Sequence, residues 1–157
     1  MTSTVRFYLG EFCCDSINVW IGLIGMDSLD QLTLNHNKLE HLGAGFFRGL
    51  NSLTTLYVDH NQIQTVNKDA FEGLEDSLTS LTLTGNQIQE FPMLALRRIH
   101  RLQTLHLDDN KVSYAWRMKS TRFDPRVPFL PQITRLEEDA FEGFGEHIKF
   151  LWLQNNL

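Results

Sequence analysis

Residues 78–86 read Leu-Thr-Ser-Leu-Thr-Leu-Thr-Gly-Asn, so that apolar residues at positions 78, 81 and 83 precede an asparagine at position 86. The same spacing occurs in four further blocks: Leu29–Asn37, Leu53–Asn61, Leu102–Asn110 and Ile148–Asn156. A second motif comes just before the next block at three places: Phe47-x-Gly49-Leu50, Phe71-x-Gly73-Leu74 and Phe141-x-Gly143-Phe144. The first four blocks start 24 or 25 residues apart. A fixed period of this length predicts a solenoid of stacked coils.

The apolar and polar residues of each block alternate, which indicates a short strand. Stacked coils pair such strands in parallel about 4.8 Å apart. We therefore predict an α/β solenoid with a parallel sheet on its concave face and short irregular or helical convex segments. The asparagine after each strand turns the chain inward, where its amide can pair with buried backbone groups. We expect one buried ladder of these residues: Asn37, Asn61, Asn86, Asn110 and Asn156.

Composition narrows the classes of function. The chain has 157 residues and a net charge of -5, which disfavours nucleic acid because phosphate binding needs a basic face. No stretch approaches the roughly 18 apolar residues of a membrane span, so this segment is not expected to insert into a membrane. The sequence lacks a phosphate-binding glycine loop, zinc-ligand spacing and a nucleophile elbow. We therefore predict a non-enzymatic protein with no catalytic residues and no cofactor.

Histidines and cysteines are the remaining candidates for chemistry. His36 and His60 occupy the same repeat position and should lie about 5 Å apart, but Gly85 takes that position in the next repeat and supplies no third ligand. We interpret them as a surface pair and predict no metal site. Cys13 and Cys14 are adjacent, and we interpret them as apolar fillers rather than a redox centre.

The repeats divide the chain into four segments. Residues 1–22 form a divergent N-terminal segment, interpreted as a degenerate repeat in which Val5 and Cys13 stand 24 residues before Leu29 and Asn37. Leucine-containing repeats then occupy residues 23–111. An insertion of low order follows at 112–132, and the repeats continue over 133–157, stopping in mid-repeat.

The insertion at 112–132 accounts for the excess length of the fourth repeat. It holds three of the four prolines, and four basic residues against one acidic residue. One interpretation is a true loop at a turn where repeats tolerate insertions. The other is a retained intron, because splice-like codons can encode both of its ends, and long unstructured loops are uncommon in compact folds. We favour the intron, and transcript sequencing across this junction decides between the two.

The outward positions of the strands form three rows on the concave face. The first row is Gln31, Thr55, Ser80, Thr104 and Phe150, and the central row is Thr33, Tyr57, Thr82, His106 and Trp152. The third row is Asn35, Asp59, Thr84, Asp108 and Gln154. We predict that the central and third rows bind another protein. Tyr57, His106 and Trp152 are the expected anchors, since aromatic residues dominate interface hot spots. Asp59 and Asp108 would favour a partner with a basic surface.

The repeat L-x-x-L-x-L-x-x-N-x-L-x-x-L-x-x-x-x-F-x-G-L resembles the 24-residue leucine-rich repeat of animal cell-surface and extracellular-matrix proteins. The variant at Ala70–Leu78, with its 25-residue step, is similar to the repeats of chaoptin and related arthropod and nematode proteins. The resemblance implies a leucine-rich-repeat horseshoe that is secreted or membrane-tethered. It also implies a role in adhesion, matrix organisation or receptor recognition.

The chain also departs from that family. Cysteine-rich caps, a signal peptide and an anchor are not visible in it, which is the pattern of a fragment or truncated gene model with an uncapped last strand. Two alternatives stay open: an intracellular leucine-rich-repeat scaffold or adaptor, and the recognition region of a larger receptor enzyme. Neighbouring coding sequence distinguishes these from the extracellular interpretation, because cap cysteines with a leader peptide support an extracellular array and a downstream kinase motif supports a receptor enzyme.

Overall fold

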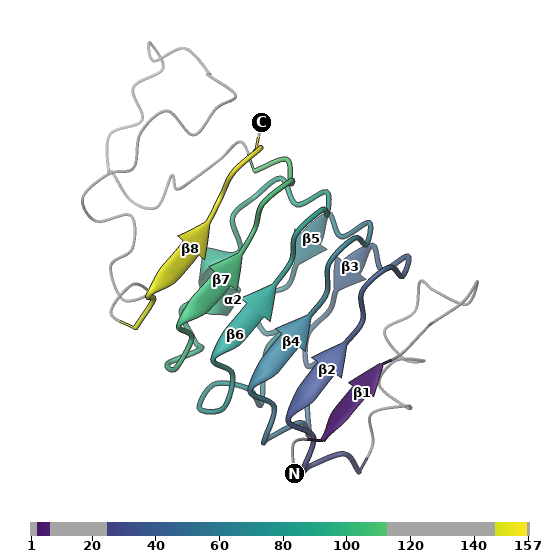
Figure 1. Cartoon of the computed structure of the whole chain (residues 1–157), viewed down its shortest axis with the longest axis vertical. Coiled ribbons are helices and arrows are strands. Elements are labelled where there is room, and N and C mark those ends of the chain that lie inside the picture. Colours follow the sequence, from purple (N-terminus) through teal and green to yellow (C-terminus); the bar gives the residue numbers. More distant parts are fainter. Residues whose placement is uncertain (1–2, 7–24, 113–146, 157) are drawn as a thin grey trace.

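Stacked coils form a six-stranded parallel main sheet in the described part of the chain, as the repeat period predicts (Figure 1). The computed structural model describes residues 3–6, 25–112 and 147–156. The strands of the sheet, in spatial order, are β1 (Thr4–Arg6), β2 (Gln31–Thr33), β4 (Thr55–Tyr57), β6 (Ser80–Thr82), β7 (Thr104–His106) and β8 (Phe150–Trp152). Every neighbouring pair is parallel. The predicted solenoid is therefore confirmed.

The strands pair in the register that the repeat period dictates. Leu32 lies opposite Leu56, and Leu56 lies opposite Leu81. The series continues through Leu105 to Leu151. On β2, β4, β6 and β7 the middle residue is buried and the flanking residues are half-buried. Each leucine thus points into the solenoid, while its neighbours point to the concave face, defined here as the sheet face that points away from the core.

The convex side is built from short elements. A second parallel sheet pairs β3 (His41–Leu42) with β5 (Thr65–Val66), and the third coil has a single helical turn, α2 (Met93–Leu96). Both lie behind the main sheet in Figure 1. The Phe47 and Phe71 rings stack with centroids 5.9 Å apart. Leu96, fully buried on α2, occupies the corresponding position of the next coil, as predicted.

The asparagine ladder is present and is buried at Asn37, Asn61, Asn86 and Asn110, whereas Asn156 on the last coil is half-buried. Asn86 is 5% exposed, and its Nδ2 donates to the carbonyl oxygens of Leu83 at 2.9 Å and Val58 at 3.0 Å. Its Oδ1 accepts the Ile63 backbone N–H at 3.2 Å. Asn61, Asn110 and Asn156 repeat this pattern of own-coil and preceding-coil contacts. Each amide satisfies backbone groups that would otherwise be unpaired in the core.

Two predictions about coil boundaries are wrong. Val5 pairs with Leu32 rather than standing at the Leu29 position, so the step from the first strand to the second is longer than 24 residues. Val112 belongs to the repeat core and not to the insertion. It is fully buried, and its N–H donates to Asn156 Oδ1 at 3.1 Å, as Ile88 does to Asn110.

The rest of the predicted insertion, residues 113–132, lies outside the described residues, as do Cys13 and Cys14. The 21 extra residues of the fourth repeat can be assigned equally well one position later along the chain. Valine at position 112 suits the core position as well as isoleucine at position 133 does. At the other end of the sheet, Leu151 and Leu153 on the β8 coil are only partly buried, whereas Leu105 and Leu107 one coil earlier are fully buried. Within the described residues β8 is an edge strand, as the sequence suggests.

Candidate functional site

The concave face holds the side chains that the repeat positions assign to it. Strand register aligns the central row from Thr33 through Tyr57, Thr82 and His106 to Trp152. Hydrogen bonds link Asn35 to Asp59, Asp59 to Thr84, and Thr84 to Asp108 along the third row. Gln154 continues this row on the β8 coil and is exposed. These predicted positions share one surface, but their surroundings differ from coil to coil.

Aromatic side chains gather at the β7–β8 end of the concave face. The His106 and Trp152 rings stack with centroids 4.0 Å apart and planes 6° apart. The Phe150 ring lies 5.6 Å from that of Trp152, and Phe150 is 56% exposed. Tyr57 lies on β4 and is separated from this group by Thr82 on β6. The three predicted anchors therefore do not form one cluster: His106 and Trp152 are together, and Tyr57 is apart.

Phe150 is a component of this surface that the predicted site omits. It belongs to the first row, whose other members are polar, and that contrast is the signal that could have identified it. Its counterpart Thr104 is directly opposite on β7. An exposed phenylalanine next to a stacked tryptophan is an apolar feature of the kind found at the centre of protein interfaces.

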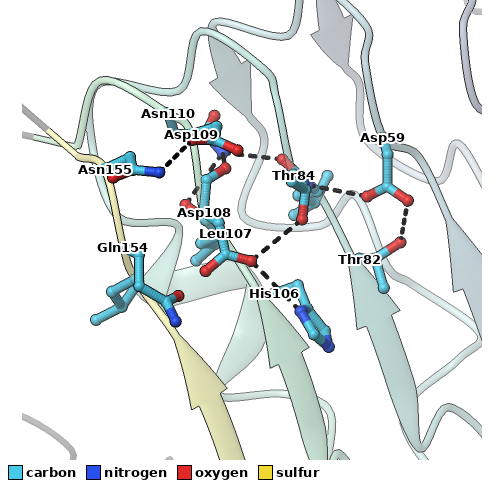
Figure 2. Close-up of polar contacts among 12 residues, drawn as sticks. Asp59, Thr82, Thr84, His106, Leu107, Asp108, Asp109, Asn110, Gln154 and Asn155 are labelled. Atoms are coloured by element: carbon cyan, nitrogen blue, oxygen red, sulfur yellow. Dashed lines mark hydrogen bonds and ion pairs between the residues drawn. The ribbon is translucent and has the colours of Figure 1, made fainter.

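The two carboxylates of the third row have different environments (Figure 2). Asp59 accepts from Thr82 Oγ1 at 2.8 Å, the Thr84 backbone N–H at 2.9 Å and Asn35 Nδ2 at 3.2 Å. Donors of its own sheet therefore occupy this carboxylate. Asp59 holds the third row together and has little remaining capacity for a partner.

Asp108 is bonded more weakly. Its Oδ2 has two long contacts, to Thr84 Oγ1 at 3.4 Å and to His106 Nδ1 at 3.4 Å. Its Oδ1 is buried and has no hydrogen-bond donor in the described structure. In the preceding coils the corresponding oxygens of Asn35 and Asp59 each accept a backbone N–H, at 2.7 Å and 2.9 Å. Asp108 is therefore the member of the row with unused accepting capacity.

Basic residues border these three rows, and exposed Lys149 directly precedes Phe150 on the β8 coil. None of their positions on the β2, β4, β6, β7 and β8 coils is lysine or arginine. Arg6 lies on β1 at the register of Thr33, at the other end of the sheet from β8. Elsewhere, Arg48 pairs with Glu72 at 2.7 Å, and Arg98 pairs with Asp69. The three rows are thus polar to acidic, with His106, Trp152 and Phe150 at one end and Tyr57 apart from them.

The two equivalent histidines stack, at the separation that the sequence predicts. The rings of His36 and His60 are 4.8 Å apart with planes 8° apart. Both residues have a left-handed backbone, with φ of 58° and 54°. Gly85 has φ of 68° at the same position, and a Cβ there would lie 2.5 Å from His60 Nδ1. The His60 ring therefore uses the space that the glycine leaves open.

The described residues hold no group of three or more histidine, cysteine or acidic side chains that could bind a metal ion. The same part of the chain has no helix long and apolar enough to cross a membrane. What the geometry offers is a contact surface. It can supply hydrogen bonds, aromatic stacking and a carboxylate to another molecule.

Comparisons agree with this description. Residues 27–88 match the leucine rich repeat family. A structure of human 5T4 (Wnt-activated inhibitory factor 1, trophoblast glycoprotein) is similar with a TM-score of 0.55 and 24% identity, over 82% of this chain and 42% of that chain. A chain of the Drosophila melanogaster SNF/U2A′ complex gives a TM-score of 0.45 and 30% identity, over 54% of this chain and 48% of that chain. A comparison with curated protein sequences gives no match.

Residues 27–88 therefore consist of leucine-rich repeats, and the stacked parallel coils have the fold of a leucine-rich-repeat solenoid. Leucine-rich repeat domains are generally protein-interaction modules rather than enzymes, and their concave sheets form extended binding surfaces. The chain spans less than half the length of each of these two solved structures.

Proposed function

We propose that this chain is a non-enzymatic module that binds another protein through its concave face, as part of a secreted or cell-surface protein. Its role would be in adhesion, matrix organisation or receptor recognition. The observation that carries the binding proposal is the aromatic group of exposed Phe150 and half-buried Trp152 and His106. It lies on a sheet face whose row positions on the β2, β4, β6, β7 and β8 coils include no lysine or arginine. The fold depends on the buried leucines and asparagines, but it does not require aromatic residues at these outward positions.

The extracellular part of the proposal rests on the repeat class. The 24-residue period with a convex phenylalanine is typical of extracellular arrays. In this chain the convex rings of Phe47 and Phe71 stack on each other. An intracellular scaffold or adaptor is the second candidate, since it would use the same concave face. Labelling intact cells that express the complete transcript with a membrane-impermeant reagent separates the two. Labelled protein supports the extracellular role, and protein labelled only after lysis supports the intracellular one.

Photo-crosslinking tests the location of the binding surface. A photoreactive phenylalanine analogue replaces Tyr57 or Thr104 on the concave face, or Leu94 on the convex helix α2, which is 48% exposed. We expect protein adducts from positions 57 and 104 in cells that express the complete transcript. Position 94 is the matched control, because it is exposed but lies on the opposite side. Adducts from position 94 alone would overturn the proposal.

A further inference from the structure

We propose that the β7–β8 end of the concave face binds an arginine side chain of the partner protein, with Asp108 and Trp152 as the main contacts. This inference rests on the proposed function and narrows it to one class of ligand and one end of the sheet. Three observations carry it: the aromatic stack, the state of the Asp108 carboxylate and the distribution of charge.

The aromatic stack provides the flat surface that a guanidinium group requires. His106 and Trp152 are nearly parallel, at 6°, and Phe150 extends the same group along β8. A guanidinium group is planar and stacks on aromatic faces, tryptophan above all. Phe150 can contact the methylene groups of the arginine or an apolar neighbour of it, because more than half of its surface is exposed.

The Asp108 carboxylate provides the acceptor. A buried oxygen without a donor costs free energy, and Oδ1 of Asp108 is in that state among the described residues. The Cβ–Cγ torsion of aspartate is soft, so rotation can bring this oxygen towards a guanidinium N–H group. Oδ2 lies near the His106 ring and therefore near the stack. A carboxylate next to an aromatic face fits arginine better than lysine, since only arginine combines a planar face with a fork of donors.

The rest of the concave face is less suited to this role. Asp59 already accepts three hydrogen bonds from its own sheet. Its row neighbour Thr84 contributes a hydroxyl group and no charge. No row position on the β2, β4, β6, β7 and β8 coils is lysine or arginine, so a cation at Asp108 meets no positive side chain among its row neighbours there. The charge of the face and its aromatic residues therefore favour the same ligand at the same end.

The test uses Trp152 as the reporter. Replacing Trp20 and Trp116 by phenylalanine in the full chain leaves Trp152 as its only tryptophan. The probes are three capped tripeptides, Leu-Arg-Leu, Leu-Lys-Leu and Leu-citrulline-Leu. Citrulline keeps the shape of arginine without its charge. We expect saturable quenching of Trp152 by the arginine peptide, and binding weaker by about tenfold or more for the citrulline peptide.

Two matched variants locate the contact. Asp108→Asn removes the charge at the proposed site, and Asp59→Asn makes the same change two coils away. Asparagine fits this row, because Asn35 already occupies it and accepts the Asp59 N–H. We expect Asp108→Asn to weaken arginine-peptide binding about tenfold and Asp59→Asn to change it less than about twofold. Circular dichroism of each variant checks that the sheet is intact.

Three results would overturn the inference: equal binding of the citrulline peptide, equal loss in both variants, or no saturable change up to about 10 mM peptide. Each of them leaves the proposed function standing if concave crosslinks are observed. Conversely, arginine-dependent quenching without concave crosslinks would contradict the proposed function alone.

Discussion

Replacing Asn86 by alanine should remove about 2–4 kcal/mol of unfolding free energy, because it leaves the Ile63 N–H without an acceptor and removes two further buried hydrogen bonds. Its amide contacts the Leu83 and Val58 carbonyl oxygens at 2.9 Å and 3.0 Å, and its oxygen accepts the Ile63 N–H at 3.2 Å. The two carbonyl oxygens keep a second donor, from Asn110 and Asn61, so each lost bond there costs roughly 0.5–1.5 kcal/mol, while the unpaired Ile63 N–H costs roughly 1–3 kcal/mol. A water molecule in the space left by the amide recovers part of this.

Asn86→Asp separates this explanation from packing. Aspartate has nearly the same shape, so a pure packing effect would leave stability almost unchanged. The carboxylate, however, would direct an acceptor at two carbonyl oxygens and bring a charge into a site that is 5% exposed. We therefore expect Asn86→Asp to be at least as destabilising as Asn86→Ala.

Urea unfolding followed by far-ultraviolet circular dichroism measures both variants. The matched control is Asn67→Ala, because Asn67 is exposed and its side chain accepts only the Asp69 N–H, at 3.0 Å. Its expected cost is below about 1 kcal/mol. The reasoning is refuted if Asn86→Asp unfolds at the wild-type midpoint, or if the Asn67 and Asn86 alanine variants lose equal stability.

Gly85→Ala should cost about 2 kcal/mol, from left-handed backbone strain together with displacement of the His60 ring. In the His60→Ala background the stability cost of Gly85→Ala should fall by about 1 kcal/mol. Additive costs of the two substitutions in a thermal double-mutant cycle would contradict a clash between the new Cβ and the His60 ring. Arg48→Ala should change stability by less than about 1 kcal/mol despite its 2.7 Å pair with Glu72, because that pair is exposed. A larger loss of stability that disappears at high salt would contradict this expectation. Val112→Ala should cost about 1–2.5 kcal/mol in chemical denaturation, and a neutral result would return Val112 to the insertion.

Much of the fold follows from the sequence, because each coil repeats the same solution to the same packing problem. The spacing from Leu78 to Asn86 specifies strand, inward side chains and turn together, so the register of β2 through β8 could be predicted. The two errors occur where the repeat is interrupted. β1 has no matching asparagine block to set its register, and valine at position 112 satisfies the core as well as isoleucine at position 133.

The candidate site was predictable in position but not in chemistry. Periodicity shows which residues point outward, including His106 and Trp152, but it does not show which of them touch. Asp59 and Asp108 are equivalent in the repeat. They differ in the structure because Thr82, on the coil after Asp59, donates to it, whereas the corresponding residue on the coil after Asp108 is Trp152. Such differences depend on side chains one coil apart, and repeat spacing alone does not contain them.

The asparagine ladder gives the stack a polarity. Asn61, Asn86, Asn110 and Asn156 each bond to backbone groups of the coil before them. Loss of a coil from the C-terminal side therefore leaves a main-chain N–H group of its neighbour unpaired, whereas loss from the N-terminal side leaves a side-chain amide that water can reach. During synthesis, each newly made coil completes the bonding of the one that left the ribosome before it.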